Sequence, residues 1–273
     1  MVRRSAEYLA RHGVPSPRET AEALVMHVLG TDRAGMYART EGLDTPTAKR
    51  LGRALCRRCA GTPLQHLTGE QRFLDLDLEV RPGVFVPRPE TEGLVVAALE
   101  VLEGIASPAV IDVGTGTGAI AVAIKARRPD ARVIAIDRSE AAASLAQANA
   151  DRLGLDVDVV LGDLLDAAPV AWRGRVDLVV SNPPYVEPEA FDTLPADVRA
   201  DPAEALVGGT DVHARLAADA SGWLRAGGWL AMEIGQDQGE AVRSMFGPAW
   251  SRAEVLPDLA GRDRVVRARF DGA

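Results

Sequence analysis

The feature that most constrains the fold is the alternation of short apolar runs with helix-like stretches from residue 109 onward. Strand-like runs occupy 109–113, 132–137, 157–161, 176–180 and 228–234, with two more near 250–256 and 264–270. Helix-like stretches such as A-I-A-V-A-I-K-A-R lie between the first four. Strands that alternate with helices form βαβ units, in which a parallel sheet is covered on both faces. The pattern predicts an α/β domain built on a mostly parallel sheet of seven strands.

The first part of the chain follows a different pattern. Residues 1–62 carry helix signals throughout, and F-L-D-L-D-L-E-V at 73–80 then alternates apolar and acidic residues, as a half-buried strand does. We expect an N-terminal helical bundle over 1–62, a β-hairpin linker over 63–86 and the α/β domain over 87–273. The bundle has no catalytic constellation of its own.

Composition and charge exclude several classes of protein. The net charge of -8 and the pI of 5.1 speak against a broad nucleic-acid surface, which needs clustered Lys and Arg. No apolar run approaches the roughly 20 residues that cross a membrane, and the start M-V-R-R-S-A lacks the apolar core of a secretion signal. Cys56 and Cys59 have no second Cys or His pair nearby, so they are expected to be structural and no metal site is predicted. We therefore expect a cytoplasmic protein that binds neither membranes nor nucleic acid directly.

A glycine-rich segment, D-V-G-T-G-T-G-A at 112–119, follows the first strand and opens a helix. Glycines there let the backbone approach a ligand and present amide N–H groups at a helix N-terminus. Asp137 closes the second strand, where a carboxylate can accept the hydroxyls of a ribose. The segment also satisfies G-x-G-x-x-G/A, so a dinucleotide-dependent enzyme remains open. The ligand is predicted to contain a nucleoside.

Two acidic residues favour S-adenosylmethionine as that ligand. Asp112 would repel a pyrophosphate but suits a cationic sulfonium and ammonium. Asp163 follows the third strand, where its carboxylate can accept from an adenine amino group. A turn-forming role for Asp112 and a helix-capping role for Asp163 are the alternatives.

The fourth strand runs into S-N-P-P-Y-V-E-P at 181–188. If the ligand is S-adenosylmethionine, a methyl group can be transferred to an NH₂ group, and a planar NH₂ nitrogen is such a poor nucleophile that the site has to position it and accept its N–H bonds. Asn182 supplies a side-chain carbonyl, and Pro183 a backbone carbonyl without a competing N–H. Pro184 stiffens the segment, and Tyr185 can stack on a planar amide. An ordinary turn at the end of a strand is the alternative.

Several segments, in order along most of the chain, resemble the HemK/PrmC-type release-factor glutamine methyltransferases, a family of class I S-adenosylmethionine-dependent methyltransferases. They are P-L-Q-H-L-T-G-E-Q-R-F at 63–73, G-V-F-V-P-R-P-E-T-E at 83–92, D-V-R-A-D-P-A-E-A-L-V-G-G-T-D at 197–211 and D-L-A-G-R-D-R-V-V at 258–266, together with the glycine-rich and S-N-P-P-Y segments. The resemblance implies a Rossmann-like, seven-stranded class I methyltransferase domain and S-adenosylmethionine as cofactor. It implies methyl transfer to the side-chain amide N5 of a protein glutamine, in the Gly-Gly-Gln loop of class I peptide-chain release factors. We expect the enzyme to be a monomer, and we expect the helical bundle over 1–62 to recognise the protein substrate.

The site residues are predicted in three groups. The catalytic residues are Asn182, Pro183 and Tyr185, and the substrate-binding residues are Asn182, Pro183, Pro184 and Tyr185. The cofactor-binding residues are Gly114, Thr115, Gly116, Thr117, Gly118, Asp137, Asp163, Leu164 and Asn182.

Other functions remain open at this stage. A ribosomal-protein glutamine methyltransferase would carry the same motifs. A DNA adenine-N6 methyltransferase meets the same chemical problem at an exocyclic NH₂, but needs a basic channel and a target-recognition region. A nicotinamide-dependent dehydrogenase and a non-catalytic cofactor-binding protein are the remaining alternatives.

A few charged residues have uncertain roles. Arg88 and the segment Glu90-Thr91-Glu92 can border the methionine end of the cofactor, or they can simply begin a helix at Pro89 with acidic residues in its first turn. Glu233 lies inside an apolar strand, where it needs a partner, and can face the active site or pair with an Arg. Arg262 and Arg264 are expected to stabilise the fold or lie on its surface.

Overall fold

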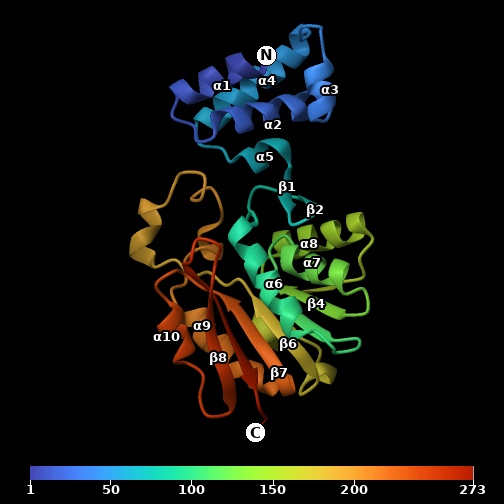
Figure 1. Cartoon of the computed structure of the whole chain (residues 1–273), viewed down its shortest axis with the longest axis vertical. Coiled ribbons are helices and arrows are strands. Elements are labelled where there is room, and N and C mark those ends of the chain that lie inside the picture. Colours follow the sequence, from blue (N-terminus) through green and yellow to red (C-terminus); the bar gives the residue numbers. More distant parts are fainter. Residues whose placement is uncertain (273) are drawn as a thin grey trace. The chain divides into compact units, whose positions relative to one another are not determined.

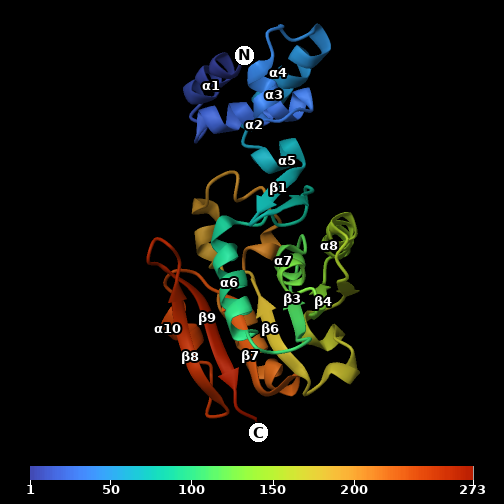
Figure 2. The same cartoon turned by 45° about the vertical axis from the view of Figure 1, so that its right-hand side comes forward.

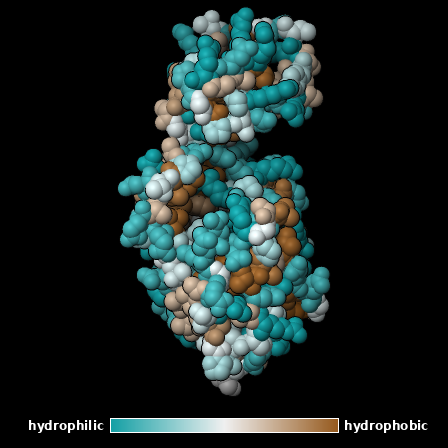
Figure 3. Space-filling model, turned by 60° about the vertical axis from the view of Figure 1, so that its left-hand side comes forward, coloured by the Kyte–Doolittle hydropathy of each residue, from teal (hydrophilic) through white to brown (hydrophobic). Residues whose placement is uncertain are grey.

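The computed structural model describes residues 1–272 and divides into two compact units. The first unit comprises Met1–Glu70 and Leu194–Ala200, and the second comprises Gln71–Thr193 and Asp201–Ala273. The hydrophilic residues that cover most of the face seen in Figure 3 are those expected of a chain with 26% charged residues. Within residues 1–272, none of the helices has both the length and the apolar character needed to span a membrane.

The first unit is helical, as its sequence predicts. Its helices are α1 (Val2–Arg11), α2 (Pro17–Leu29), α3 (Arg33–Ala38), α4 (Thr45–Cys59) and α5 (Leu64–Thr68) (Figure 1). Side-chain caps fix where two of them begin: the carboxylates of Asp32 and Asp44 accept from the N–H groups of Gly35 and Thr47, each at 2.7 Å. Buried Leu24, Val25, Met36 and Leu51 form one core cluster, and Leu9, Val14 and Ala21 form another.

The segment predicted as a hairpin linker contains a helix as well as a hairpin. Helix α5 occupies Leu64–Thr68, where the sequence has no period-two alternation. The hairpin strands are β1 (Glu70–Phe73) and β2 (Leu76–Glu79). The alternating run is thus two strands rather than one, because Leu74 adopts a left-handed backbone conformation, φ 53°, and turns the chain. Glu92 helps to hold this turn, since its Oε1 accepts from the Leu74 N–H at 2.8 Å.

The second unit contains the predicted seven-stranded sheet. Its strands are β3 (Ala109–Val113), β4 (Arg132–Asp137), β5 (Asp158–Leu161), β6 (Val176–Ser181), β7 (Leu224–Glu233), β8 (Trp250–Pro257) and β9 (Asp263–Phe270). They lie in the order β5-β4-β3-β6-β7-β9-β8. The first five strands in this order are parallel, and β9 runs antiparallel to both β7 and β8. The predicted Rossmann-like, class I methyltransferase fold is confirmed.

Helices cover both faces of this sheet (Figure 2). They are α6 (Glu92–Val101), α7 (Ala119–Arg127), α8 (Glu140–Leu153), α9 (Asp211–Asp219) and α10 (Gly239–Arg243). Side chains alternate between the faces: Val110 packs in the cluster that holds α6 and α7, while Ile111 packs in the cluster that holds α9 and α10. Because both faces are covered, the central strands β3 and β6 are buried at every position, and they are apolar except for Asp112, Asp177 and Ser181. Six short 3-10 helices complete the described structure: η1 (Pro89–Thr91), η2 (Leu164–Ala167), η3 (Val170–Trp172), η4 (Pro188–Thr193), η5 (Ala203–Ala205) and η6 (Ala220–Gly222).

The strand order determines where a ligand can bind. After β3 the chain moves outward through β4 to β5, and it then returns to the other side of β3 as β6. In open α/β sheets, ligands bind beyond the carboxyl ends of the strands at this reversal. The glycine-rich segment follows β3 there, and S-N-P-P-Y follows β6.

Candidate active site

The glycine-rich loop has a backbone that other residues adopt with difficulty. Gly114, Gly116 and Gly118 have φ values of 71°, 57° and 82°. A Cβ on Gly114 or Gly116 would meet no protein atom within 4 Å, so this side of the loop is open. A Cβ on Gly118 would lie 3.1 Å from Ala146, so the third glycine allows α7 and α8 to pack closely. The first two glycines are therefore the ones that can admit a ligand.

Asp137, the last residue of β4, braces this loop. Its Oδ2 accepts from the Gly116 N–H at 2.8 Å, and its Oδ1 accepts from the Ser139 N–H at 2.9 Å. Each carboxylate oxygen has a second lone pair, so both can still accept from ribose hydroxyls. The structure thus gives Asp137 a bracing contact that its sequence position alone does not predict.

Asp112 is fully buried beneath the loop. Its Oδ2 accepts from the Thr115 hydroxyl at 2.6 Å and from the Ala121 N–H at 3.1 Å, which joins the loop to α7. Its Oδ1 has no hydrogen-bond partner among residues 1–272. Burial raises the pKa of this carboxyl to about 7, and the hydrogen bonds from Thr115 and Ala121 oppose the shift. A buried, unpaired carboxylate oxygen beside open glycines fits a cationic nucleoside such as S-adenosylmethionine.

Asp163 lies just after β5, and its side chain is partly exposed to solvent. Its Oδ2 accepts from Arg215 Nη2 at 3.1 Å, and both side chains are about half exposed. Its side chain does not cap the 3-10 helix that follows. Leu164 has a φ of 46°, a left-handed conformation that a non-glycine residue adopts at a cost. Because only Oδ2 of Asp163 is bonded among the described residues, its Oδ1 can accept a hydrogen bond from an adenine amino group.

Asn149 on α8 is a residue of this region that the sequence analysis missed. Its Nδ2 donates to the carbonyls of Thr117 and Glu79, at 2.9 and 3.0 Å, and its Oδ1 accepts from the Glu79 N–H at 2.8 Å. It is fully buried. The only sequence signal for this role is a single Asn within an otherwise alanine-rich helix.

The N-P-P-Y segment, residues 182–185, begins directly after β6. Ser181 anchors it, since the Ser181 hydroxyl donates to the Val113 carbonyl at 2.7 Å. Asn182 Nδ2 donates to the Thr91 hydroxyl oxygen at 3.1 Å. Because the amide nitrogen is bound in this way, Asn182 Oδ1 is the group that remains to accept a hydrogen bond. Thr91 is buried at the end of η1, so the hydroxyl that fixes the orientation of the Asn182 amide is itself enclosed by the protein.

Tyr185 is tied to Glu233 at the end of β7. The phenol donates to Glu233 Oε1 at 3.2 Å, while Oε2 has no well-aligned partner among the described residues. Burial raises the pKa of Glu233 to about 7, whereas Thr91, Arg264 and Tyr185 lower it. Burial, followed by the charge of Glu233, also raises the pKa of the Tyr185 phenol. Glu233 thus faces the site rather than forming a simple ion pair, and it lies beside both Thr91 and Tyr185.

Two further segments hold the backbone of N-P-P-Y in place. Gln238 Nε2 donates to the Tyr185 carbonyl at 2.9 Å, and its Oε1 accepts from the Gly235 N–H at 2.9 Å. Gly208 packs against Pro184 so closely that a Cβ there would lie 2.4 Å from the Pro184 carbonyl oxygen. The sequence analysis noted the segment that contains Gly208, but it missed Gln238 and did not predict these contacts.

The remaining charged residues have structural partners. Arg88 pairs with buried Asp201, which also accepts from the Val86 N–H at 3.3 Å. Arg264 is buried and donates to the Ile234 carbonyl at 3.1 Å, and Arg262 pairs with Asp258 at 2.8 Å. The expectation that Arg262 and Arg264 stabilise the fold agrees with these contacts.

Comparison with known proteins gives matches over nearly the whole length. The model of the PrmC N-terminal domain matches residues 1–69, and the model of the methyltransferase small domain matches residues 76–247. A release factor glutamine methyltransferase of Moorella thermoacetica is 46% identical over 95% of this chain and 94% of its own length. One from Deinococcus radiodurans is 43% identical over 97% of this chain and 95% of its own length.

Solved structures support the fold independently. A 16S rRNA N2 G1207 methyltransferase from T. Thermophilus, in complex with AdoMet and guanosine, superposes with a TM-score of 0.55 at 22% identity, covering 74% of this chain and 49% of that one. A methyltransferase from Pyrococcus furiosus gives a TM-score of 0.53 at 17% identity, covering 83% of this chain and 100% of that one. At these identities the likeness establishes a shared fold.

Proposed function

This chain belongs to the family of release factor glutamine methyltransferases, and on that premise we propose that it methylates the side-chain amide N5 of a glutamine. The methyl donor is S-adenosylmethionine, and the target is the Gly-Gly-Gln loop of a class I peptide-chain release factor. The enzyme acts in the cytoplasm, as a monomer that does not itself bind nucleic acid.

The observation that carries this proposal is the fixed orientation of Asn182. Thr91 accepts from Asn182 Nδ2, so Asn182 Oδ1 is available to accept an N–H from a substrate amide. The Pro183 carbonyl, which has no N–H of its own residue beside it, is the second acceptor. Two acceptors directed at one NH₂ group hold its nitrogen in line for attack and favour a pyramidal geometry.

The cofactor residues have complementary roles in this proposal. S-adenosylmethionine, when bound, supplies a methyl group on a positively charged sulfur. Gly114 and Gly116 admit it, Asp137 accepts from its ribose hydroxyls, and Asp112 provides a negative charge beneath the loop. Transfer of the methyl group would form an N–C bond and break its bond to sulfur, so that the sulfur would leave as a neutral thioether and the proton lost from the amide nitrogen would pass to solvent.

Tyr185 and Glu233 keep the substrate amide in place. Tyr185 stacks on the planar amide, and its phenol is held by Glu233. Glu233 and Thr91 are positioning residues, because they act through Tyr185 and Asn182 rather than on the substrate. The helical bundle of residues 1–62 is proposed to bind a part of the release factor away from the glutamine.

Incubation with methyl-labelled S-adenosylmethionine tests the substrate. The purified protein is offered a class I release factor, ribosomal proteins or double-stranded DNA in separate reactions. We expect label on the release factor, and none on a release factor whose Gly-Gly-Gln glutamine is replaced by asparagine. Label on ribosomal protein or on DNA, with none on the release factor, would establish one of the alternative functions instead.

A further inference from the structure

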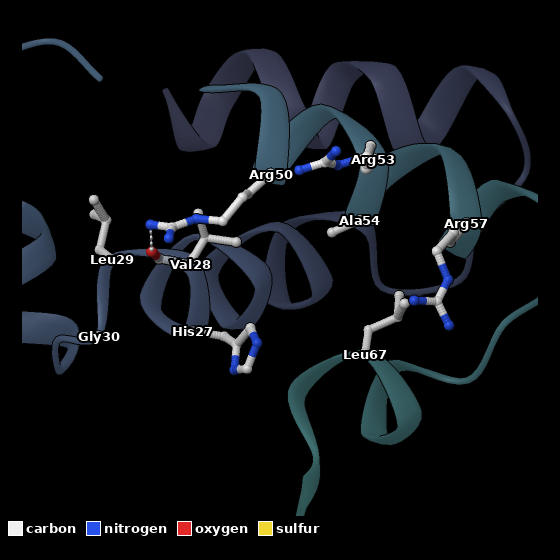
Figure 4. Close-up of a pocket in the computed structure, with 9 residues that line it drawn as sticks. All are labelled: His27, Val28, Leu29, Gly30, Arg50, Arg53, Ala54, Arg57 and Leu67. Carbon is white, nitrogen blue, oxygen red and sulfur yellow. Dashed lines mark hydrogen bonds between the residues drawn. The ribbon is translucent and has the colours of Figure 1, made fainter. Parts of the chain in front are cut away.

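The N-terminal unit contains a pocket of about 560 Å³ that the proposed chemistry does not use (Figure 4). It lies where the C-terminal end of α2 meets α4 and α5. Its apolar lining residues are Val28, Leu29, Ala54 and Leu67. Its cationic lining residues are Arg50, Arg53 and Arg57, with His27 beside them. We refer to it as the arginine pocket.

Helix α4 carries an unbalanced charge. Its sequence, T-P-T-A-K-R-L-G-R-A-L-C-R-R-C, has five cationic residues and no acidic one. Lys49 and Arg53 are spaced i, i+4, as are Arg53 and Arg57, and like-charged pairs at this spacing destabilise a helix slightly. A cation near the helix C-terminus, such as Arg57, is favoured by the helix dipole, but Arg53 in the middle of the helix is not. The free helix thus bears a repulsion that a bound anion would relieve.

The arginines of the pocket differ from others in the same unit. Arg18 and Arg33 on α2 and α3 both pair with Glu22. Arg50 donates to the Val28 carbonyl at 3.1 Å and so caps the end of α2. The side chains of Arg53 and Arg57 have no hydrogen-bond or ion-pair partner within residues 1–272, although their backbones are bonded within and at the end of α4.

The net charge also differs between the N-terminal part of the chain and the rest. Residues 1–70 contain 11 Lys and Arg against 7 Asp and Glu, a net charge of +4. Residues 71–273 contain 20 against 32, a net charge of -12. A basic unit within an acidic chain points to an acidic partner for that unit.

We propose that the arginine pocket binds an acidic segment of the protein substrate, in which carboxylates flank an apolar side chain. The proposal rests on the proposed function and adds to it the chemistry of the docking contact. Guanidinium groups pair with carboxylates through two parallel hydrogen bonds. The valine, leucines and alanine of the lining accommodate the apolar side chain between them.

Nucleic acid fits this pocket less well. Binding of single strands relies mainly on large aromatic side chains that stack with bases, and no Phe, Tyr or Trp is among the residues that line the pocket. A long polyanion is also repelled by the net charge of -12 on residues 71–273. A short acidic peptide can bind in the pocket without approaching the negatively charged residues of the other unit.

The test compares two double variants of the full-length enzyme. Arg53→Ala with Arg57→Ala removes the two unpaired cations, and Arg3→Ala with Arg4→Ala removes the same charge from α1 as a matched control. For the pocket variant we expect KM for the intact release factor to rise about tenfold, with a smaller effect at high salt. Its kcat, and its activity on a short Gly-Gly-Gln peptide, should stay unchanged. Its melting temperature should stay the same or rise, because a repulsion has been removed.

Each other outcome overturns a defined part of the account. Equal KM values for the pocket variant and the control would overturn the arginine pocket as a docking site, while methylation by the parent enzyme still supports the proposed function. Loss of binding to a single-stranded RNA oligonucleotide, with KM for the release factor unchanged, would assign the pocket to nucleic acid instead. An absence of release factor methylation by the parent enzyme itself would overturn the proposed function and the proposed docking partner together.

Discussion

The two units of this protein use charge in opposite ways. The N-terminal unit keeps arginines at its surface, two of them unpaired on α4. The methyltransferase unit buries carboxylates at the ends of its strands, and Asp112 and Glu233 both have their pKa raised to about 7 by burial. Exposed charges contribute mainly to encounter and affinity, whereas buried ones determine geometry and protonation. Variants of the two units should therefore change different kinetic quantities.

The largest effect is expected at Asn182. Asn182→Ala removes the oriented acceptor, and loss of one such contact in a transition state typically costs about 10²–10³ in kcat. Thr91→Val, which leaves Asn182 Nδ2 without its acceptor, should lower kcat less, and Thr91→Ser should restore it. Steady-state kinetics with a Gly-Gly-Gln peptide measure this effect without the N-terminal unit's contribution. A change in KM alone would place Asn182 with the binding residues.

Asp137 should affect the cofactor rather than the chemistry. Asp137→Ala removes charge-assisted hydrogen bonds worth on the order of 2–4 kcal/mol, so the Kd for S-adenosylmethionine should rise by roughly 30-fold to 1000-fold. Isothermal titration calorimetry with S-adenosylmethionine measures this Kd for the parent enzyme and the variant. Asp130→Ala is the matched control, because Asp130 Oδ2 also accepts a backbone N–H, that of Ser107 at 2.8 Å, but in the turn before β4. An unchanged Kd for Asp137→Ala would show that the ribose binds elsewhere.

Gly208 tests whether the backbone of N-P-P-Y has to stay fixed. Gly208→Ala places a Cβ within 2.4 Å of the Pro184 carbonyl oxygen, so the segment has to shift. We expect kcat to fall about tenfold, in line with the sensitivity of catalysis to small displacements, while cofactor affinity is kept. Gly93→Ala on α6 is the control, since a Cβ there meets nothing within 4 Å. Similar kcat values for the two variants would show that the segment tolerates movement.

The smallest effect is a dependence of stability on pH. Glu233 has a folded-state pKa of about 7, above its ordinary value, so its contribution to stability is full at low pH and is lost as pH rises toward and through about 7. Glu233→Gln should therefore gain stability relative to the parent enzyme between pH 5 and pH 8, by roughly 1–3 kcal/mol. Comparing variant with parent cancels other groups that titrate there, such as Asp112 and buried His213, whose pKa burial lowers.

Urea unfolding at several pH values, without cofactor, gives this difference. Glu240→Gln is the control, because Glu240 is exposed on α10 and pairs only locally with Arg243. A stability difference between Glu233→Gln and the parent that stays constant with pH would contradict the buried, protonated state of Glu233.

Local patterns predicted the sheet well because they depend on near neighbours. The predicted strands at 109–113 and 132–137 coincide with β3 and β4. The start of β7 was missed, since it begins at Leu224, before the apolar run at 228–234, and its pairing with β6 is irregular near Val176. Periodicity does not reveal a strand portion that contains Arg-Ala-Gly-Gly.

The contacts that complete the site could not be predicted in this way. Thr91 and Asn182 are 91 residues apart in the chain, and Tyr185 and Glu233 are 48 apart. Tyr185 and Glu233 meet because β6 and β7 are neighbouring parallel strands whose carboxyl ends lie together. Thr91 directly precedes α6, so its contact with Asn182 depends on how α6 packs against β6 and β7. The sequence could mark Glu233 as a buried acid in need of a partner, but it could not identify Tyr185 as that partner.

The most direct test of the account is to locate the transferred methyl group by fragmentation mass spectrometry. Release factor methylated by the parent enzyme is digested, and the peptide that contains Gly-Gly-Gln is fragmented. The account predicts one added methyl group, placed on the side-chain amide nitrogen of that glutamine, and none in a parallel reaction with Asn182→Ala over the same time. A methyl group on any other residue of the release factor, or on the backbone of this peptide, would contradict it.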